Sequence, residues 1–143
     1  MIIPDANLLL YAYYPRAVQH DASRSWLEAV LSGLEMVRFP WQTLWGFLRI
    51  STNAKLFEQP LSTSEAAEAV SSWLERPNAG IIEPGERHWE ILRRLLDDAQ
   101  CTGPLVADAA LAATVIEHGG TLYSTDRDFS RFKGLEWVNP LET

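Results

Sequence analysis

The sequence predicts an α/β fold, a three-layer α/β/α sandwich with a mostly parallel central sheet. Short apolar runs alternate along the chain with longer segments whose apolar residues recur at helical spacing. The chain also opens with an apolar run that ends at Pro4 and Asp5 and passes directly into good helix formers. A buried parallel strand enters its crossover helix in this way. We expect one domain over residues 1–143.

The first half of the chain supplies three helices and one further strand. Helix formers and a stop at Pro15 predict a helix over 5–14. A second helix is expected over 21–34, where the apolar residues at helical spacing are Trp26, Leu27, Val30, Leu31 and Leu34. Alternation that ends at a proline predicts a strand over 36–39, and a strongly apolar run predicts a helix over 41–51.

The second half repeats the alternation. A capping-box pattern predicts a helix over 62–76, and a strand is expected over 79–84. Helices follow over 87–100 and 105–118, the latter closed by Gly119. The remaining expected elements are a strand over 121–125, a polar turn over 126–129 and a last strand over 135–138.

The composition is that of a soluble globular protein, with 47% hydrophobic and 22% charged residues. The single cysteine, Cys101, permits no internal disulfide and suits a reducing compartment. No basic leader is present, and no apolar run approaches the roughly 18 residues of a membrane span. We expect a cytoplasmic protein without membrane contact.

The net charge of −7 argues against nucleic-acid binding by bulk attraction. It does not exclude a nuclease that works through bound cations, because the positive charge of such an enzyme can be local. Arg127, Arg131 and Lys133 lie close together near the C-terminus, and Arg49 and Lys55 form a possible second group. Each could equally be a solvated surface charge.

Acids follow two of the predicted strands. Asp5 closes the opening strand, and Asp126 comes directly after the strand over 121–125. The carboxyl ends of parallel strands share one edge of the sheet, and the N-termini of crossover helices meet it. Asp108, near the start of the helix over 105–118, is therefore expected at the same edge, on the apolar stripe of its helix.

Each acid also has an ordinary structural alternative. Asp5 could be only a helix N-cap, because Asp favours that position. Asp126 could be a solvated turn residue, and Asp108 could simply favour the positive end of its helix. Delivery of carboxylates to one edge by three separate segments favours a shared site, because clustered like charges repel unless a cation offsets them.

Carboxylate oxygens suit hard cations, so Mg²⁺ is the predicted cofactor, with Mn²⁺ as an alternative. The histidines His20, His88 and His118 are scattered and no CxxC pair exists, which disfavours zinc. A Mg²⁺ ion held by few carboxylates keeps waters, and it can activate one of them while it neutralises a phosphate oxygen. Phosphodiester hydrolysis is the reaction that such a site suits best.

The chain resembles a PIN-domain ribonuclease, and more specifically the toxin of a VapBC-type toxin–antitoxin pair. The opening segment 3–12 is similar to the first acidic motif of the family, and 46–53 is similar to a segment common in one branch. Segments 107–113 and 124–129 match the family closely, as does the continuation over 132–141. The ordered set runs from end to end of the chain.

The resemblance implies a Mg²⁺-dependent endoribonuclease that cuts RNA, commonly tRNA or rRNA, and so inhibits translation. Asp5, Asp108 and Asp126 would bind the metal and act as the catalytic acids. The resemblance also implies a VapB-type antitoxin that covers the active site, and a toxin homodimer.

Other residues of the same motifs would have supporting roles. Ser124, Thr125 and Asp128 flank the last catalytic acid and would support it. Arg49 and Arg127 are the candidate contacts to RNA.

The helix over 41–51 departs from the family pattern. The family commonly supplies a glutamate from this helix, whereas Trp41, Gln42 and Gly46 occupy the corresponding positions here. Either Asp128 fills the gap, or the site binds one metal rather than two, or catalysis is weak.

Two other functions remain open. A PIN-like protein that binds RNA or a partner with little or no cleavage would account for the missing glutamate. A phosphoacceptor receiver domain also gathers acids at a sheet edge. It needs an acidic pair after the first strand and a lysine after a late one, but Asp5 has no acidic neighbour and Lys133 matches only loosely.

The six tryptophans could be core or contact surface. Trp41 and Trp45 are four residues apart and lie on one face of their predicted helix. We expect this helix or its neighbour to contribute to a homodimer or antitoxin interface.

Overall fold

The computed structural model of the protein describes residues 1–142. The strands are β1 (Ile2–Pro4), β2 (Val37–Pro40), β3 (Ala79–Ile82), β4 (Thr121–Tyr123) and β5 (Trp137–Val138). The helices are α1 (Ala6–Ala12), α2 (His20–Leu31), α3 (Trp41–Ser51), α4 (Thr63–Leu74), α5 (His88–Ala99), α6 (Leu105–His118) and the 3-10 helix η1 (Arg127–Arg131). Across these residues no helix is both long and apolar enough to cross a bilayer.

The strands form one sheet in the order β3-β2-β1-β4-β5, and every pairing is parallel. The short strand β1 lies at the centre, where Ile2 is in register with Val37 on one side and with Thr121 on the other. Since all strands run the same way, their carboxyl ends lie along a single edge. This confirms the predicted α/β fold with a parallel sheet.

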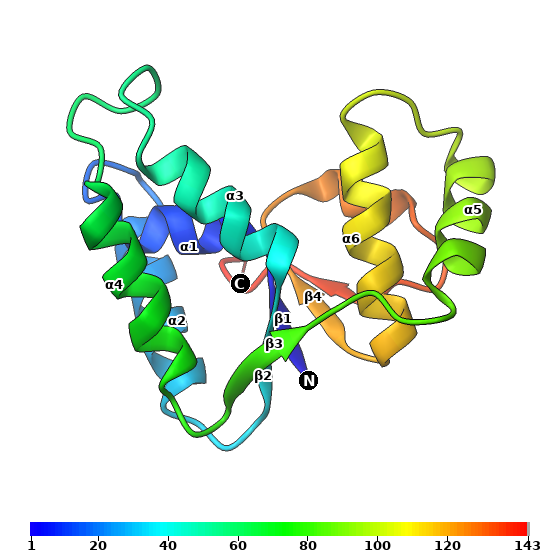
Figure 1. Cartoon of the computed structure of the whole chain (residues 1–143), viewed down its shortest axis with the longest axis horizontal. Coiled ribbons are helices and arrows are strands. Elements are labelled where there is room, and N and C mark those ends of the chain that lie inside the picture. Colours follow the sequence, from blue (N-terminus) through cyan, green and yellow to red (C-terminus); the bar gives the residue numbers. More distant parts are fainter. Residues whose placement is uncertain (143) are drawn as a thin grey trace.

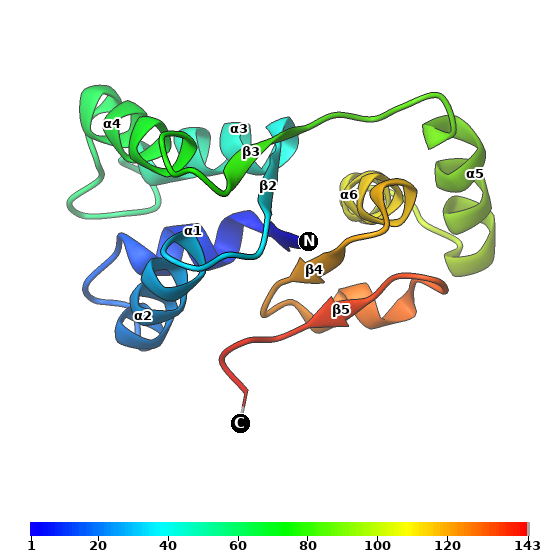
Figure 2. The same cartoon turned by 90° about the horizontal axis from the view of Figure 1, so that it is seen from below.

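A separate hydrophobic core covers each face of the sheet. Neighbouring residues of a strand point to opposite faces, and accordingly Ile2 belongs to one core and Ile3 to the other. Helices α1 to α4 enclose the first core, whereas α5, α6 and η1 enclose the second (Figures 1 and 2). The predicted three-layer sandwich is confirmed.

Two helix ends that were predicted from local sequence patterns are confirmed. Ser62 and Glu65 form the expected capping box at the start of α4, with bonds of 3.0 Å and 2.9 Å. Gly119 ends α6 in the left-handed conformation at φ +67°, which costs a residue without a β-carbon little.

Several predicted elements have different bounds in the structure, most of them shorter, and two of the differences have an identifiable cause. Helix α2 ends at Leu31, and Leu34 is fully exposed in the following loop instead of completing the apolar stripe. The reason is a tertiary contact, because the Asn78 side chain donates to the Val30 carbonyl and turns the chain toward β2. The polar turn expected over 126–129 is part of the longer η1, whose first residues are capped by the Asp126 carboxylate.

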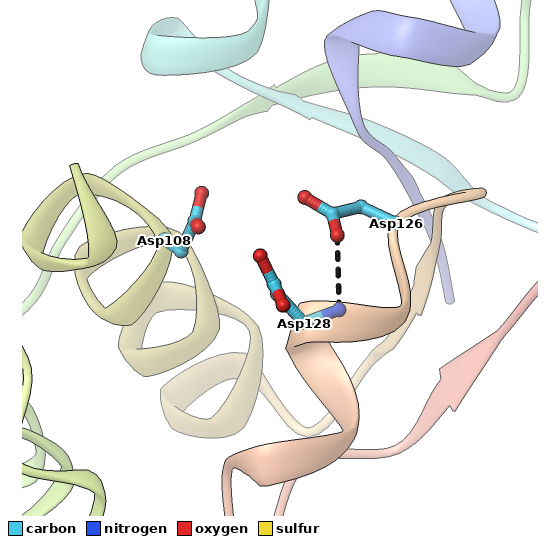
Figure 3. Close-up of side chains that lie close together, drawn as sticks. All are labelled: Asp108, Asp126 and Asp128. Carbon is cyan, nitrogen blue, oxygen red and sulfur yellow. Dashed lines mark hydrogen bonds between the residues drawn. The ribbon is translucent and has the colours of Figure 1, made fainter.

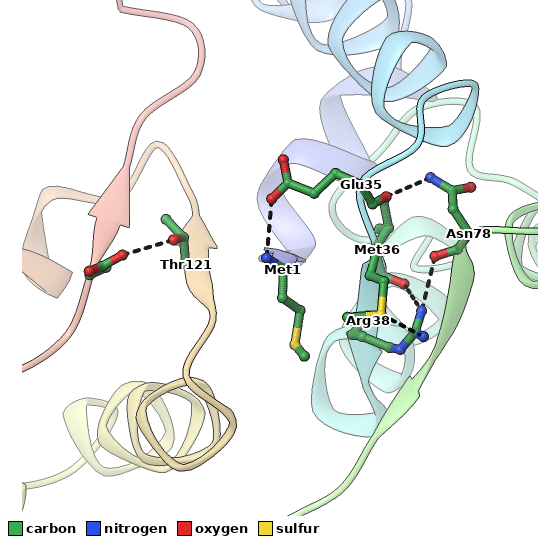
Figure 4. A network of polar contacts seen from close by, with 8 residues as sticks. Met1, Glu35, Met36, Arg38, Asn78 and Thr121 are labelled. Atoms are coloured by element: carbon green, nitrogen blue, oxygen red, sulfur yellow. Dashed lines mark hydrogen bonds and ion pairs between the residues drawn. The ribbon is translucent and has the colours of Figure 1, made fainter.

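A polar network fastens the amino edge of the sheet (Figure 4). The Asn78 amide donates to the Glu35 carbonyl at 2.8 Å, and Arg38 Nη1 donates to the Asn78 carbonyl at 2.9 Å. The Met1 amino group pairs with the Glu35 carboxylate at 3.1 Å, and Thr121 donates to Glu136 at 3.1 Å. This network lies at the edge of the sheet opposite to the one that carries Asp5 and Asp126.

Candidate active site

Asp5 has two structural partners at the carboxyl end of β1. Its Oδ1 accepts a hydrogen bond from the Ala6 amide at 2.8 Å and so caps α1. Its Oδ2 accepts a second bond, from Ser124 Oγ, also at 2.8 Å. A cap requires one carboxylate oxygen, so the second oxygen is available to join Asp5 to the end of β4. Asp5 is therefore both a helix cap and part of the edge.

Ser124 is the centre of this arrangement. Its side chain is fully buried just beyond β4. Its hydroxyl donates to Asp5 and accepts from the Asp126 amide at 3.0 Å and from Asn7 Nδ2 at 3.2 Å. A hydroxyl offers one donor and two acceptor lone pairs, so Ser124 uses its full capacity. The serine holds the loop that carries Asp126 against the loop that carries Asp5.

Asp126 orients the residues that follow it. Its Oδ1 accepts from the Asp128 amide at 2.9 Å, which caps η1. This turn brings the Asp128 carboxylate back toward that of Asp126, and both face Asp108 on α6 (Figure 3). Each of the three residues has a carboxylate oxygen within 4.8 Å of those of the other two.

The negative charges perturb one another. Burial, and then the charges of Asp126, Asp5 and Asp128, raise the pKa of Asp108 from 3.8 to about 6, while Arg131 opposes this rise. Burial also raises the pKa of Asp5; the hydrogen bonds from Ser124 and Ala6 oppose that rise, and the charge of Asp126 adds to it. The edge therefore carries negative charge that its own side chains do not fully compensate.

The donors fit a hard divalent cation. All the converging groups are carboxylates, which are the preferred ligands of Mg²⁺ and Mn²⁺. A bound cation would also relieve the repulsion that raises the pKa of Asp108. Arg131 Nη2 lies 3.2 Å from Asp128 Oδ1 and supplies one positive charge at the border of the cluster.

The start of α3 adds no acid to the cluster. Gln42 Nε2 donates to the Ala107 carbonyl at 2.8 Å, next to Asp108, and Trp41 Nε1 donates to Glu83. Gly46 faces α1, where a β-carbon on it would lie 3.4 Å from that of Ala6. The structure brings Asp128 into the cluster as a third carboxylate, whereas α3 contributes none.

The other predicted site residues make no side-chain hydrogen bond or ion pair with the three carboxylates among residues 1–142. Thr125 is half-buried and makes no side-chain hydrogen bond with the described residues. Arg127 is 79% exposed and pairs with Glu142 at 2.8 Å. Arg49 lies in the last turn of α3, at the end opposite to the carboxyl edge. The sequence pattern singled out the acids. It gave Ser124 only a supporting role, although Ser124 bonds to Asp5, Asp126 and Asn7, and it did not show that Arg131 pairs with Asp128.

Known proteins resemble the chain in sequence over nearly its whole length. The profile of the PIN domain family matches residues 2–135. The ribonuclease VapC33 of Mycobacterium tuberculosis is 40% identical over 141 residues, with 99% of both chains covered. VapC37 of the same organism is 41% identical over 140 residues, with 98% of this chain and 97% of its own covered.

The same fold occurs in the solved structure of VapBC2 from Rickettsia felis bound to a DNA fragment from its promoter. A chain of that structure matches with a TM-score of 0.72 at 17% identity, with 97% of this chain and 98% of that chain covered. The family profile covers most of the chain, and relatives about 40% identical span nearly all of it. The chain therefore belongs to the PIN domain family and, within it, to the VapC ribonucleases.

Proposed function

We propose that the chain is a Mg²⁺-dependent endoribonuclease, the toxin of a type II toxin–antitoxin system, which acts in the cytoplasm. It hydrolyses phosphodiester bonds in tRNA or rRNA and thereby inhibits translation. The observation that carries the proposal is the convergence of Asp108, Asp126 and Asp128 within 4.8 Å, with Asp5 joined to them through Ser124. Membership of the VapC ribonucleases supports RNA as the substrate.

Each acid has a defined task in this proposal. Asp5, Asp108, Asp126 and Asp128 hold the cation, which is Mg²⁺ or, as an alternative, Mn²⁺. When bound, such an ion lowers the pKa of a coordinated water and offsets charge on a phosphate oxygen. Ser124 fixes the Asp5 carboxylate through its hydroxyl. The cap that Asp126 makes on η1 fixes the backbone at Asp128, so the ligands need little rearrangement.

Incubation of total cellular RNA with purified protein tests the proposal. We expect discrete fragments with Mg²⁺, and intact RNA with EDTA or with either Asp5→Ala or Asp108→Ala. The fragments themselves identify the target. Intact RNA in every lane, with RNA still bound in a gel-shift experiment, would instead support the alternative in which the protein binds RNA or a partner without cutting.

The raised pKa of Asp108 predicts how Mg²⁺ binding depends on pH. The folded, metal-free protein keeps a proton on Asp108 up to about pH 6, and this proton competes with Mg²⁺. Cleavage at limiting Mg²⁺ should therefore fall about tenfold per pH unit below pH 6, because one proton must leave before the ion binds. The same competition should make the Mg²⁺-induced rise in Tm large at pH 7.5 and small at pH 5.

In the metal-free protein, the raised pKa of Asp108 makes the free energy of unfolding depend on pH. Asp108 loses its proton near pH 3.8 when unfolded and near pH 6 when folded. Its contribution to the free energy of unfolding is thus fully present below about pH 4 and is lost as pH rises through 6. The Asp108→Asn variant should lack this decrease. Equal Mg²⁺-induced stabilisation at pH 5 and pH 7.5 would show that Asp108 does not couple protons to metal.

The partners in this proposal are a VapB-type antitoxin and a second copy of the chain. Trp41 is 37% and Trp45 is 63% exposed, and their rings stack with centroids 6.3 Å apart on the surface of α3. Two large exposed rings on one helix face suit a protein interface. By contrast, Trp73 is buried in the core between α3 and α4.

A Trp45→Ala variant should weaken assembly without unfolding the protein, because the ring is mostly exposed in the single chain. We expect a loss of affinity of tenfold or more for the partner that covers it, the size typical of an interfacial tryptophan. Analytical ultracentrifugation of the toxin alone and with its antitoxin measures both associations. Trp89→Ala, which removes another ring 64% exposed but on α5, is the matched control. Unchanged assembly in both measurements would exclude this face of α3.

A further inference from the structure

The positive side chains of the protein divide into three groups. Those that pair with a carboxylate are Arg16, Arg24, Arg127 and Arg131. Those that donate to backbone carbonyls are Arg38 and Arg76. Those without an acceptor among residues 1–142 are Arg49, Lys55, Arg87, Arg93, Arg94 and Lys133. We call these six residues the uncommitted cations. Because the chain has a net charge of −7, a polyanion is expected to bind where they lie close together.

Two of the uncommitted cations come together from distant segments. Arg94 projects from α5, and its Nη2 lies 3.8 Å from the point that a β-carbon on Gly134 would occupy. Gly134 directly follows Lys133, and both Arg94 and Lys133 are exposed. Figures 1 and 2 agree that the chain after η1 runs beside α5. The fold therefore brings Arg94 beside the segment that carries Lys133.

Arg131 connects this pair to the acidic cluster. Its Nη2 pairs with Asp128 Oδ1 at 3.2 Å, and its Nε donates to the Asp128 carbonyl at 3.1 Å. Its charge reaches Asp108, whose pKa it lowers against the effect of burial and the other acids. The side chain nevertheless keeps 37% of its surface exposed. One cation therefore lies at the carboxylates and another lies beside Gly134, with Lys133 on the segment between them. We call Arg131, Lys133 and Arg94 the cationic strip.

The far border of the strip is acidic. A hollow on the outer face of α5 is lined by Trp89, Glu90, Arg93, Arg94, Asp97 and Asp98. The three acids of this hollow outnumber its two arginines, so the strip of positive charge does not continue across it. Lys and Arg bind nucleic acid by neutralising phosphates, and an arginine can donate two parallel hydrogen bonds to one phosphate.

We propose that the RNA substrate enters the active site over η1, with successive backbone phosphates bound by Arg131, Lys133 and Arg94. This inference rests on the proposed ribonuclease function and assigns a path to its substrate. In this path Arg127 is not a main RNA contact, because its guanidinium pairs with Glu142.

Salt-dependent RNA binding tests the path. An Asp108→Asn background stops cleavage, and Arg94→Gln and Lys133→Gln are added to it singly and together. The affinity for a fluorescent single-stranded RNA of about 20 nucleotides is measured by anisotropy with Mg²⁺ over a series of KCl concentrations. Each phosphate contact on a single strand contributes about −0.7 to the slope of log affinity against log salt. The double variant should therefore lose about 1.4 from the slope.

Two control variants separate charge from structure. Arg94→Lys should keep most of the slope, because it keeps the charge, whereas a purely structural role of the guanidinium would not be rescued. Lys55→Gln removes another lysine without an acceptor, in the loop after α3, and should leave the slope unchanged. A slope that changes with Lys55→Gln and not with Lys133→Gln would overturn the path, as would an unchanged slope in the double variant.

The binding assay does not depend on cleavage, so the two proposals can fail separately. If the native protein cuts RNA but the strip variants keep the full salt slope, the path is wrong and the ribonuclease function stands. If the native protein cuts no RNA but the strip variants lose slope, the function is wrong and the RNA-binding surface stands.

Discussion

An Asp126→Asn variant should keep the fold and lose RNA cleavage, with kcat reduced about 1000-fold. The amide oxygen of the substituted side chain can still accept from the Asp128 amide, so the cap on η1 survives. The charge that would hold the cation is lost, however. Electrostatic stabilisation by a catalytic metal contributes several kcal/mol, and each loss of about 1.4 kcal/mol slows a reaction tenfold.

Initial rates of RNA cleavage at saturating Mg²⁺ measure this effect, and circular dichroism checks that the fold is retained. Asp21→Asn is the matched control, because Asp21 is exposed in the first turn of α2 and makes no ion pair with residues 1–142. The control should cleave RNA at the native rate. Cleavage by Asp126→Asn within tenfold of native would remove Asp126 from the catalytic group.

A Ser124→Ala variant should lower both stability and metal affinity. The change leaves the Asp126 amide and Asn7 Nδ2 without their acceptor, and it removes the hydroxyl donor from Asp5. Unsatisfied buried polar groups cost about 1–3 kcal/mol each. Loss of a partner that orients a metal ligand typically reduces metal affinity or activity by about 10- to 100-fold.

Urea unfolding and calorimetric titration with Mg²⁺ separate these two effects. Ser25→Ala, at an exposed position on α2, should change neither quantity. A destabilised Ser124→Ala protein with native Mg²⁺ affinity would show that the serine supports the fold alone. Native stability with reduced Mg²⁺ affinity would show that Ser124 acts only by orienting the Asp5 carboxylate.

Local patterns were sufficient to place Asp5, Asp108 and Asp126 at one edge. Each lies at a strand end or in the first turn of a helix, and in a parallel sheet such positions share one edge. The pairing of β1 with β4, which local patterns do not predict, then brings Asp5 and Asp126 together. The capping box of α4 and the glycine that ends α6 are equally local signals. These features could be predicted because their causes lie within a few residues.

Features that depend on distant contacts could not be predicted in the same way. Leu34 leaves the apolar stripe because Asn78, from the loop before β3, ends the preceding helix. Asp128 joins the cluster only through the turn that Asp126 imposes on η1. The position of Arg94 beside Gly134 depends on how α5 packs, and α5 alone gives no sign of it.

The central position of β1 has a consequence for the newly made chain. This first strand pairs with β2 and with β4, and Ser124, the partner of Asp5, is 119 residues further along the chain. During synthesis the middle of the sheet cannot close until β4 has left the ribosome, and pairings of such long range also form slowly. Asp5 and Asp126 meet only at that stage. The candidate site is thus expected to assemble only after β4 and Asp126 have emerged from the ribosome that makes them.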